Sequence, residues 1–396
     1  MATINPINSN IPIEVANGGT GDTTLTAHGV LVGNGTGAVA VTAAGTTGQF
    51  FTATTSADPA FATYNSRMDS VASNPASPIV GQDWFNSTNT AFRGYGNVPE
   101  AWVTKQSMNT ARAELGGAGL TTNNVLSFGG NTGAVSAVTE LYDVGANTWT
   151  TKTALNTARS QLAGAGLTSD AVLSFGGLIV TSSAVTELYS LAGNSWTTKT
   201  ALNTARRLLG GAGLTTDAAL SFGGNTTVPV ATTELYSLAG NSWTAKTAMN
   251  NARYGLSGAD IDTDNALSFG GFNAADSNKT EIYQLSGNSW TNKTNLNTAT
   301  YECGGAKLTS DLQLCIAGTT GGGGTDIKTT QLYSVSGNSW TTKSNMNTAR
   351  GGPGAGSITA ASVLAFGGWT GAGTTPTATT ELYHSGGNVV VTFTVT

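Results

Sequence analysis

The chain has 396 residues and a net charge of −5, and 10% of its residues are charged while 53 are glycine. Because an average globular protein has about 25% charged residues and about 7% glycine, this chain lacks the basic surface that a nucleic-acid backbone requires, and we expect no nucleic-acid partner. It has only two cysteines and no run of 18 apolar residues, and its first 14 residues lack the pattern of a secretion signal, so we expect no disulfide framework and no membrane insertion.

Short glycine-punctuated, threonine-rich phrases make up residues 1–62. Examples are residues 17–21 (Asn-Gly-Gly-Thr-Gly) and 43–49 (Ala-Ala-Gly-Thr-Thr-Gly-Gln). They are β-prone and show no helical periodicity. Too few large apolar residues are present for an independent core, so such a segment gains order from a partner or from oligomerisation. We predict an extended Gly/Thr-rich β arm over residues 1–62 that anchors the chain.

Residues 63–107 predict a short β-meander. Residues 83–85 (Asp-Trp-Phe) and 91–95 (Ala-Phe-Arg-Gly-Tyr) have the composition of strands, and the polar residues 86–89 between them are typical of a turn. We expect this segment to act as an adaptor between the arm and the rest of the chain.

The phrases of the arm resemble N-terminal and shaft segments of bacteriophage tail-fibre and other appendage proteins. Residues 73–78 (Ser-Asn-Pro-Ala-Ser-Pro), followed by 81–86 (Gly-Gln-Asp-Trp-Phe-Asn), are similar to adaptor modules of the same proteins. The resemblance implies that the protein is made in the host cytoplasm and becomes part of the virion, with the arm bound to other virion proteins. It also admits a homo-oligomer, such as the trimer that is common among fibre proteins.

A repeat of about 47 residues fills residues 108–396. Trp149, Trp196, Trp243 and Trp290 are 47 residues apart, and Trp340 follows after 50. Each repeat contains the same four phrases, which in the second repeat are residues 156–159 (Asn-Thr-Ala-Arg), 173–177 (Leu-Ser-Phe-Gly-Gly), 187–189 (Glu-Leu-Tyr) and 193–196 (Gly-Asn-Ser-Trp). These phrases predict four short antiparallel strands, which we label a to d. Six such units are the sequence form of a six-bladed β-propeller.

A hydrophobic strand that ends in Gly-Gly, followed by a spaced Tyr and a spaced Trp, resembles the kelch repeat. The fifth repeat departs from it with Ala317 and Gly318 at the Gly-Gly positions, and the sixth has Val390 at the Trp position. The predicted fold class is therefore all-β: a six-bladed kelch-like β-propeller over residues 108–396, preceded by the extended arm and the short β-meander.

Two segments compete for the outer strand of the sixth blade. Residues 388–396 lie in register with strand d of that blade, but residues 100–105 (Glu-Ala-Trp-Val-Thr-Lys) also have the pattern of strand d. Because residues 83–95 already predict neighbouring strands, we favour a position of residues 100–105 in the meander. This leaves residues 388–396 to complete the sixth blade.

Residues that recur once per repeat are expected to be structural. The Trp, Tyr and Phe positions predict packing between neighbouring blades, and a lysine three residues after each Trp position protects an edge strand. Arg and Glu also recur together, and the fifth repeat has Thr300 and Gln331 instead, so that both charges are lost at once. This joint loss predicts ion pairs within each blade, across the gap that Gly-Gly leaves. The pairs are Arg112 with Glu140, Arg159 with Glu187, Arg206 with Glu234, Arg253 with Glu281, and Arg350 with Glu381.

The segment between strands b and c is the candidate binding site. Its length from the second glycine to the Glu position is 10 residues in the first four repeats and 13 in the last two, while the other intervals are constant. Because strand direction alternates, all six b–c loops are expected on one face together with the d–a loops, and such variable loops commonly form the binding face of repeat proteins. The predicted ligand-binding residues are Phe272, Asn273, Asp276, Lys279, Asp326, Lys328 and Trp369.

No catalytic residues and no cofactor are predicted. The two histidines are far apart, most glutamates are assigned to the Arg pairs, and no isolated pair of acids emerges. Asp260, Asp262 and Asp264 alternate like the start of a calcium loop, but the following Gly and the distal Glu are missing, so they form only a weak calcium candidate. Cys303 and Cys315 are expected to be free buried thiols.

These expectations favour a non-enzymatic, tail-fibre-like virion appendage that presents one propeller face to a host-surface glycan or protein. A cellular kelch scaffold for protein–protein interaction is the alternative, and a glycan-active enzyme built on a propeller is the third possibility.

Overall fold

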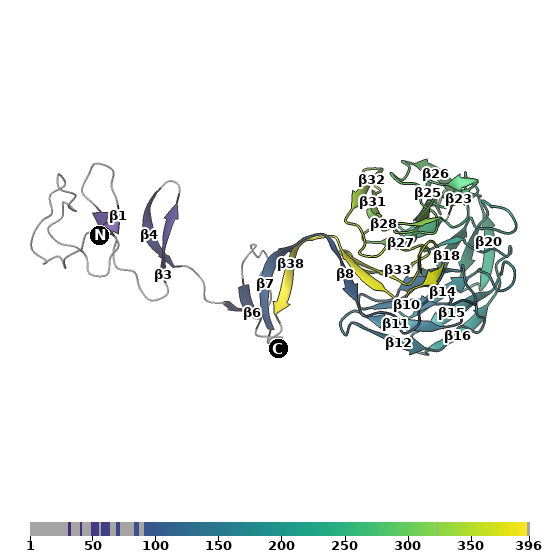
Figure 1. The fold of residues 1–396 in the computed structure, drawn as a ribbon, viewed down its shortest axis with the longest axis horizontal. Helices are drawn as coiled ribbons and strands as arrows, with labels where there is room; N and C mark the ends of the chain where they lie inside the picture. Colours follow the sequence, from purple (N-terminus) through teal and green to yellow (C-terminus); the bar gives the residue numbers. More distant parts are fainter. Residues whose placement is uncertain are drawn as a thin grey trace, which may run out of the picture. The chain divides into compact units, whose positions relative to one another are not determined.

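The computed structural model describes residues 99–387, apart from Gly323. It also describes the backbone of the strands at residues 31–32, 40–41, 49–54, 57–63, 69–71, 83–86, 91–98 and 388–393. The chain forms two compact units, one of residues 99–387 and one that combines residues 1–98 with residues 388–396. Every regular element in the described residues is a strand (Figure 1).

The unit of residues 99–387 is a β-propeller with six four-stranded antiparallel blades (Figure 1). In the first three blades the strands follow one another along the chain. Blade one contains β9 (Gly116–Gly119), β10 (Asn124–Phe128), β11 (Thr139–Asp143) and β12 (Thr148–Lys152). Blade two contains β13 (Ala163–Gly166), β14 (Ala171–Phe175), β15 (Thr186–Ser190) and β16 (Ser195–Lys199). Blade three contains β17 (Gly210–Gly213), β18 (Ala218–Phe222), β19 (Thr233–Ser237) and β20 (Ser242–Lys246).

The last three blades each carry an additional two-stranded ribbon in the b–c loop. Blade four contains β21 (Ser257–Asp260), β22 (Asn265–Phe269), β25 (Thr280–Gln284) and β26 (Ser289–Lys293), with the ribbon β23 (Phe272–Asn273) and β24 (Ala275–Asp276). Blade five contains β27 (Gly304–Lys307), β28 (Leu312–Ile316), β31 (Thr330–Ser334) and β32 (Ser339–Lys343), with β29 (Thr319–Thr320) and β30 (Thr325–Asp326). Blade six contains β33 (Gly354–Thr359), β34 (Ser362–Phe366), β37 (Thr380–His384) and β8 (Ala101–Lys105), with β35 (Trp369–Thr370) and β36 (Thr375–Pro376).

Among the described residues, the second unit has eight strands. β5 (Asp69–Val71) runs parallel to β6 (Asp83–Asn86), which pairs antiparallel with β7 (Ala91–Val98), and β38 (Gly387–Phe393) joins this sheet beside β7. This sheet includes the two predicted strands at residues 83–85 and 91–95, but it is not a simple meander. Two separate hairpins consist of β1 (Leu31–Val32) with β2 (Ala40–Val41), and of β3 (Gln49–Thr54) with β4 (Ala57–Thr63). The other residues of the predicted arm lie outside the described residues.

The ring is closed by β8, so the favoured position of residues 100–105 in the meander is wrong. Trp102 stands opposite Tyr383 of β37, with ring centroids 5.3 Å apart, and its Nε1 donates a 3.0 Å hydrogen bond to Thr330 Oγ1. The tryptophans of the other five blades make the same two contacts. Residues 388–396 contain no tryptophan, and β38 pairs in the other unit instead. Of the two candidate strands, the one that carries a tryptophan, β8, is therefore the outer strand of blade six.

The core lies between adjacent blades and is built from the repeated aromatic residues. Trp243 in blade three packs edge-to-face on Phe175 of blade two at 5.2 Å, and its Nε1 donates to Thr186 Oγ1 of that blade. The inner strands approach so closely that a Cβ on Gly213 would lie 2.0 Å from the carbonyl oxygen of Gly166. Glycine is required at such a position because the backbones of neighbouring blades touch.

Each predicted Arg–Glu pair is present within its own blade and is buried. In blade two, Arg159 Nη2 lies 3.1 Å from Glu187 Oε1, and neither side chain is exposed. Nη1 of the same arginine donates to the carbonyl of Gly176, the first glycine of the Gly-Gly pair. Burial lowers the pKa of Arg159 to about 10, although the charge of Glu187 opposes that change. The guanidinium thus links strands a, b and c at one edge of the blade.

Candidate functional site

A closed ring of backbone hydrogen bonds surrounds the propeller axis, formed by residues that lie just before the innermost strand of each blade. The residue two positions after each repeated Arg (or Thr300) donates its N–H to the carbonyl of the equivalent residue in a neighbouring blade, over distances of 2.8–3.1 Å. All six adopt a left-handed conformation with φ between 51° and 60°. We call these residues the axial ring; they are Glu114, Gln161, Leu208, Gly255, Glu302 and Gly352.

Left-handed backbone favours glycine, yet four members of the axial ring carry side chains. A non-glycine residue in this region costs on the order of 1 kcal/mol, and such residues concentrate at functional sites. After the nearly copied phrase Asn-Thr-Ala-Arg, no two repeats have the same pair of residues, which changes from Ala113 and Glu114 in the first to Gly351 and Gly352 in the sixth. These two positions vary in residue type at constant segment length, so a comparison of loop lengths does not reveal them as functional candidates.

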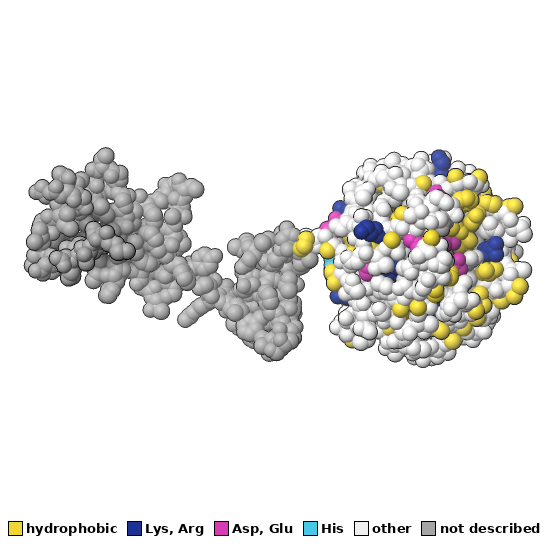
Figure 2. Space-filling model, viewed as in Figure 1, with side chains coloured by type: hydrophobic (Ala, Val, Ile, Leu, Met, Phe, Trp, Pro, Cys, Tyr) yellow, Lys and Arg dark blue, Asp and Glu magenta, His cyan; other side chains and the backbone are white. Residues whose placement is uncertain are grey.

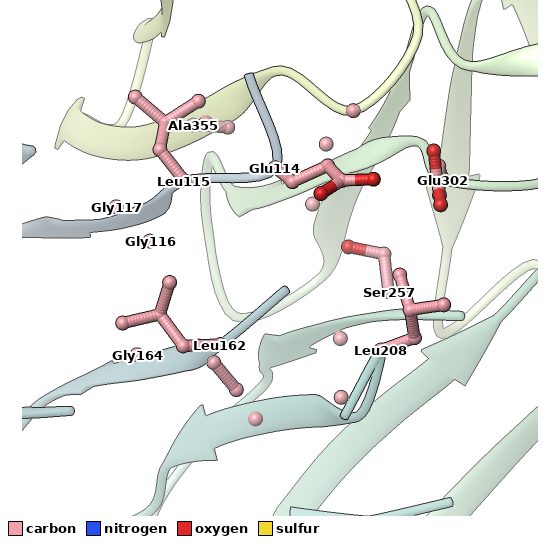
Figure 3. Close-up of a pocket in the computed structure, with 18 of the residues that line it drawn as sticks. Glu114, Leu115, Gly116, Gly117, Leu162, Gly164, Leu208, Ser257, Glu302 and Ala355 are labelled. Atoms are coloured by element: carbon pink, nitrogen blue, oxygen red, sulfur yellow. The ribbon is translucent and has the colours of Figure 1, made fainter. Parts of the chain in front are cut away.

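The axial ring surrounds the mouth of a cavity of about 140 Å³ at the centre of the face formed by the d–a and b–c loops. We call this cavity the axial pocket. Figure 3 shows the carboxylates of Glu114 and Glu302 in the same space, with the Ser257 hydroxyl nearby. A Cβ built on Gly352, between them in blade six, would lie 3.6 Å from Glu114 Cγ and 3.6 Å from Glu302 Oε2. The expectation that no isolated acid pair emerges is therefore wrong: ring closure brings together acids from the first and fifth repeats.

Both carboxyl groups are held in an environment that favours their protonated forms. Burial and the nearby charge of Glu114 raise the pKa of Glu302 to about 7, although a hydrogen bond with the Tyr301 side chain acts in the opposite direction. Burial also raises the pKa of Glu114, against the effect of Gln161, whose Nε2 donates to Glu114 Oε1 over 3.0 Å. Two like charges in a half-buried site disfavour joint ionisation, so this pair is able to retain a proton near neutral pH.

Aromatic side chains stand beside the two acids. Tyr301 precedes Glu302 and packs against Tyr254 and Phe272, with ring centroids 5.7 and 5.8 Å apart. In blade six, Trp369 pairs with Gly351, and a hydrogen bond from its side chain lowers the pKa of Glu114. Of the predicted ligand-binding residues, Phe272 and Trp369 are thus placed with the aromatic groups of this site.

The b–c loops of blades four to six are joined in sequence by two of the predicted carboxylates. Asp276 accepts hydrogen bonds from the N–H of Gly322 in the next blade, at 3.1 Å to Oδ1. Asp326 Oδ2 accepts from the N–H of Ala372 in blade six, at 2.9 Å. These acids therefore hold the three ribbons to one another, a role that a single-repeat comparison could not reveal.

The remaining predicted ligand-binding residues are exposed on the same loops. Asn273 donates through Nδ2 to the carbonyl of Ala252 at 2.9 Å, which leaves its amide oxygen available. Lys279 and Lys328 follow the ribbons of blades four and five and are exposed. The structure gives neither lysine an ion-pair partner among the described residues.

The three aspartates of the weak calcium candidate have separate roles. Asp260 pairs with Lys307 Nζ at 2.9 Å at the opposite mouth of the central channel, and Asp262 Oδ1 caps the turn by accepting the N–H of Asp264 and of Asn265. Asp264 accepts from the backbone and hydroxyl of Ser286. Across residues 99–387, no group of three or more His, Cys, Asp or Glu side chains is arranged to hold a metal ion.

Two further properties concern the described part of the chain. Cys303 and Cys315 are buried and unbridged, as predicted. None of the described elements is a helix long and apolar enough to cross a membrane.

The propeller face seen in Figure 2 carries few charged side chains, separated by uncharged ones. Recognition on such a surface depends on hydrogen bonds and aromatic contacts more than on a broad electrostatic field.

Comparison with known proteins supports the fold alone. No family model matches the chain, and no curated protein matches it by sequence. Among solved structures, one described as "Structure of YjhT" is similar, with a TM-score of 0.56 and 13% sequence identity, and the match covers 70% of this chain and 96% of that chain. The protein is thus a six-bladed β-propeller with additional strands at both ends of the chain.

Proposed function

We propose that this protein is a non-enzymatic, kelch-type recognition protein of a virion appendage. Its propeller presents the face of the axial pocket to a host-surface glycan or protein, and its N-terminal arm binds other virion proteins, with a homo-oligomer such as a trimer as the assembled form. One observation carries the recognition part of this proposal. The residues that differ between repeats, in the axial ring and in the b–c ribbons, converge on one end of the channel, while the residues that build the blades are nearly copied.

The chemistry of this face suits a carbohydrate. The pocket offers carboxylate, amide and hydroxyl groups from Glu114, Gln161 and Ser257. The half-buried Trp369 and Tyr301 supply aromatic surface beside it, next to Gly351 and Gly255 respectively. Sugars are commonly recognised by planar hydrogen-bonding groups together with an aromatic ring under the apolar face of the pyranose. The b–c loops of blades five and six are three residues longer than those of the other four blades, so the additional residues lie on one side of the ring.

The virion part of the proposal depends on the phrases of residues 1–62 and 73–86, which lie largely outside the described residues. A cellular kelch scaffold would use the same propeller face to bind a protein. Co-sedimentation of the full chain with purified virion particles, in comparison with a chain that lacks residues 1–62, tests the anchoring role. Equal retention of both chains would contradict it.

The acid pair favours one second candidate, a glycan-active enzyme. A carboxyl group whose pKa is about 7 is suited to act as a general acid near neutral pH, and Glu302 has this property. In that case Glu114 would act as the base. Incubation of the bound glycan with the protein, followed by mass spectrometry, separates the two functions, because a recognition protein leaves the glycan unchanged.

A glycan array probed with the full chain tests the recognition function. We expect retention of a restricted set of host-surface glycans, and loss of that retention in Trp369→Ala and Tyr301→Ala. Val180→Ala is the matched control, because this side chain lies in the b–c loop of blade two and is 89% exposed. If the aromatic variants and the control retain the same glycans to the same extent, the axial face is not the binding site.

A further inference from the structure

The axial pocket has a notch in blade six, where Gly351 and Gly352 contribute no side chains. The notch is bordered by Glu114 from blade one and Glu302 from blade five, and the single point at a Gly352 Cβ position is 3.6 Å from both side chains (Figure 3). A small group placed there contacts a carboxylate oxygen of Glu302 and the Cγ methylene of Glu114, whose carboxylate lines the same pocket. The cavity of about 140 Å³ is small in comparison with the 300–1,000 Å³ of typical ligand pockets. It therefore suits a single functional group with part of one ring.

The charges around the notch are predominantly negative. The charges of Glu114 and Asp326 both raise the pKa of Glu302. The opposing cation is Arg207, whose charge lowers the pKa of Glu114. Three acids against one base leave a deficit of positive charge. A ligand cation in the notch would offset it, and it would favour the ionised form of both glutamates.

Buried polar atoms near the pocket also lack partners. Ser160 is fully buried, its Oγ has no hydrogen-bond partner, and it lies close enough to the Glu114 carboxylate to lower its pKa. Gln161 uses its Nε2 to hold Glu114, while its Oε1 is buried and unpartnered, as is Asp326 Oδ1. Unpaired buried polar atoms are rare in native proteins and call for an explanation. Gln161 lines the pocket, and Asp326 Oδ1 lies 3.0 Å from a Cβ position on Gly351, so these two acceptor oxygens suit a ligand that supplies N–H donors.

Tyr301 and Trp369 do not line the pocket itself but border it, because Tyr301 packs over Gly255 of the axial ring and Trp369 pairs with Gly351 of the notch. Trp369 is near Glu114, and Tyr301 adjoins Glu302 and is supported by Tyr254 and Phe272. Aromatic faces attract a cation and also stack against the C–H face of a pyranose ring. A carboxylate pair beside such rings matches a sugar that carries a positive charge.

We propose that the axial pocket binds the protonated amino group of a de-N-acetylated amino sugar, with the ammonium at the Gly352 notch between Glu114 and Glu302. The pyranose ring then lies against Trp369 and Tyr301. This inference rests on the proposed glycan recognition and names its ligand class. An ammonium group has three N–H donors and no acceptor, which fits a site that offers carboxylate and amide oxygens. An N-acetylated sugar is excluded, because its acetamido group is neutral and has one N–H donor where the ammonium has three.

The test compares two trisaccharides of β-1,4-linked glucosamine, one with free amines and one fully N-acetylated. Isothermal titration calorimetry on the full chain at pH 7 is expected to detect binding of the amine form and to show the acetylated form at least about tenfold weaker, as expected for loss of hydrogen bonds to charged groups. Glu114→Gln and Glu302→Gln should each weaken the amine form by about tenfold or more. Both variants are structurally conservative, since Gln161 occupies the same ring position at φ 57°.

Two further variants test the position of the ammonium and the specificity of the acid pair. Gly352→Gln fills the notch, and its backbone is compatible because four equivalent residues carry side chains at the same φ; it should abolish binding of the amine form. Asp260→Asn removes an acid at the opposite channel mouth and should leave binding unchanged. Equal binding of the two trisaccharides, undiminished binding by the glutamate variants, or no binding of the amine form would each overturn the amine assignment. Retention of other glycans on the array would then leave the proposed function intact. No retention of any glycan would refute glycan recognition and leave only a protein as the host-surface ligand.

Discussion

Blade five lacks the buried Arg–Glu pair of the other blades, so it provides a natural reference for testing how much these pairs contribute to stability. In blade two, Glu187 Oε1 accepts from Arg159 Nη2 and from the N–H of Thr157, and Oε2 accepts from the N–H of Asn156 at 2.7 Å. Glu187→Gln replaces one of these two acceptor oxygens with an NH2 group. In either orientation of the amide, that NH2 group faces an N–H donor of Arg159, Thr157 or Asn156. The substitution also leaves the fully buried charge of Arg159 without its counter-ion.

The expected cost follows from these contacts. Removal of one partner of a buried ion pair destabilises proteins by about 3–5 kcal/mol, because the other charge remains desolvated. A large domain loses about 2–4 °C of melting temperature for each kcal/mol, so Glu187→Gln should lower the propeller's thermal midpoint by at least about 6 °C. Asp260→Asn is the control, since its pair with Lys307 is partly exposed and such pairs contribute about 1 kcal/mol or less.

A triple variant makes this reasoning more specific. Blade five replaces Arg, Ser and Glu together with Thr300, Cys315 and Gln331, and Gln331 Oε1 there accepts from the N–H of Thr298 at 3.0 Å. The variant Arg159→Thr/Ser174→Cys/Glu187→Gln therefore copies blade five into blade two, and it should recover most of the stability that Glu187→Gln loses. Differential scanning calorimetry measures the three midpoints. An unchanged midpoint for Glu187→Gln, or a triple variant that is no more stable than the single one, would refute the ion-pair interpretation.

Three other predictions follow from ring closure and from the axial site. Trp102→Ala should destabilise the propeller by about 3–5 kcal/mol in urea unfolding, whereas removal of residues 388–396 should leave its midpoint unchanged, because β8 and not β38 completes blade six. The pKa of Glu302 is raised to about 7, so its contribution to stability is complete below the unfolded pKa near 4.5 and is lost as the pH rises through 7. Glu302→Gln should therefore gain stability relative to the parent protein between pH 5 and pH 8 in thermal melts, and a constant difference across this range would contradict the raised pKa. Asp326→Ala should increase amide hydrogen exchange at Ala372, whose N–H it holds, and unchanged protection at that amide would show that the carboxylate does not hold the ribbon.

The sequence was sufficient to predict the blades and their internal contacts. The blades are specified by local patterns that recur along the chain, such as the spacing of Trp196 and Trp243 and the Gly-Gly that ends strand b in five repeats. The Arg–Glu pairs are revealed by the one repeat that loses both charges, at Thr300 and Gln331. A contact within one repeat recurs with the repeat, so residues that change together reveal it. The Arg–Glu pairs and the aromatic packing were predictable for this reason.

Ring closure and the axial pocket depended on the tertiary structure. A strand with the pattern of Trp102 and Lys105 can pair with any strand c, and only the complete ring determines that its partner is β37, at the far end of the sequence. Glu114 and Glu302 belong to different repeats and have no joint pattern in the sequence. They meet because every blade directs the start of its inner strand toward one axis, so that residues distant along the chain become neighbours there, and burial with mutual repulsion then raises the pKa of Glu302.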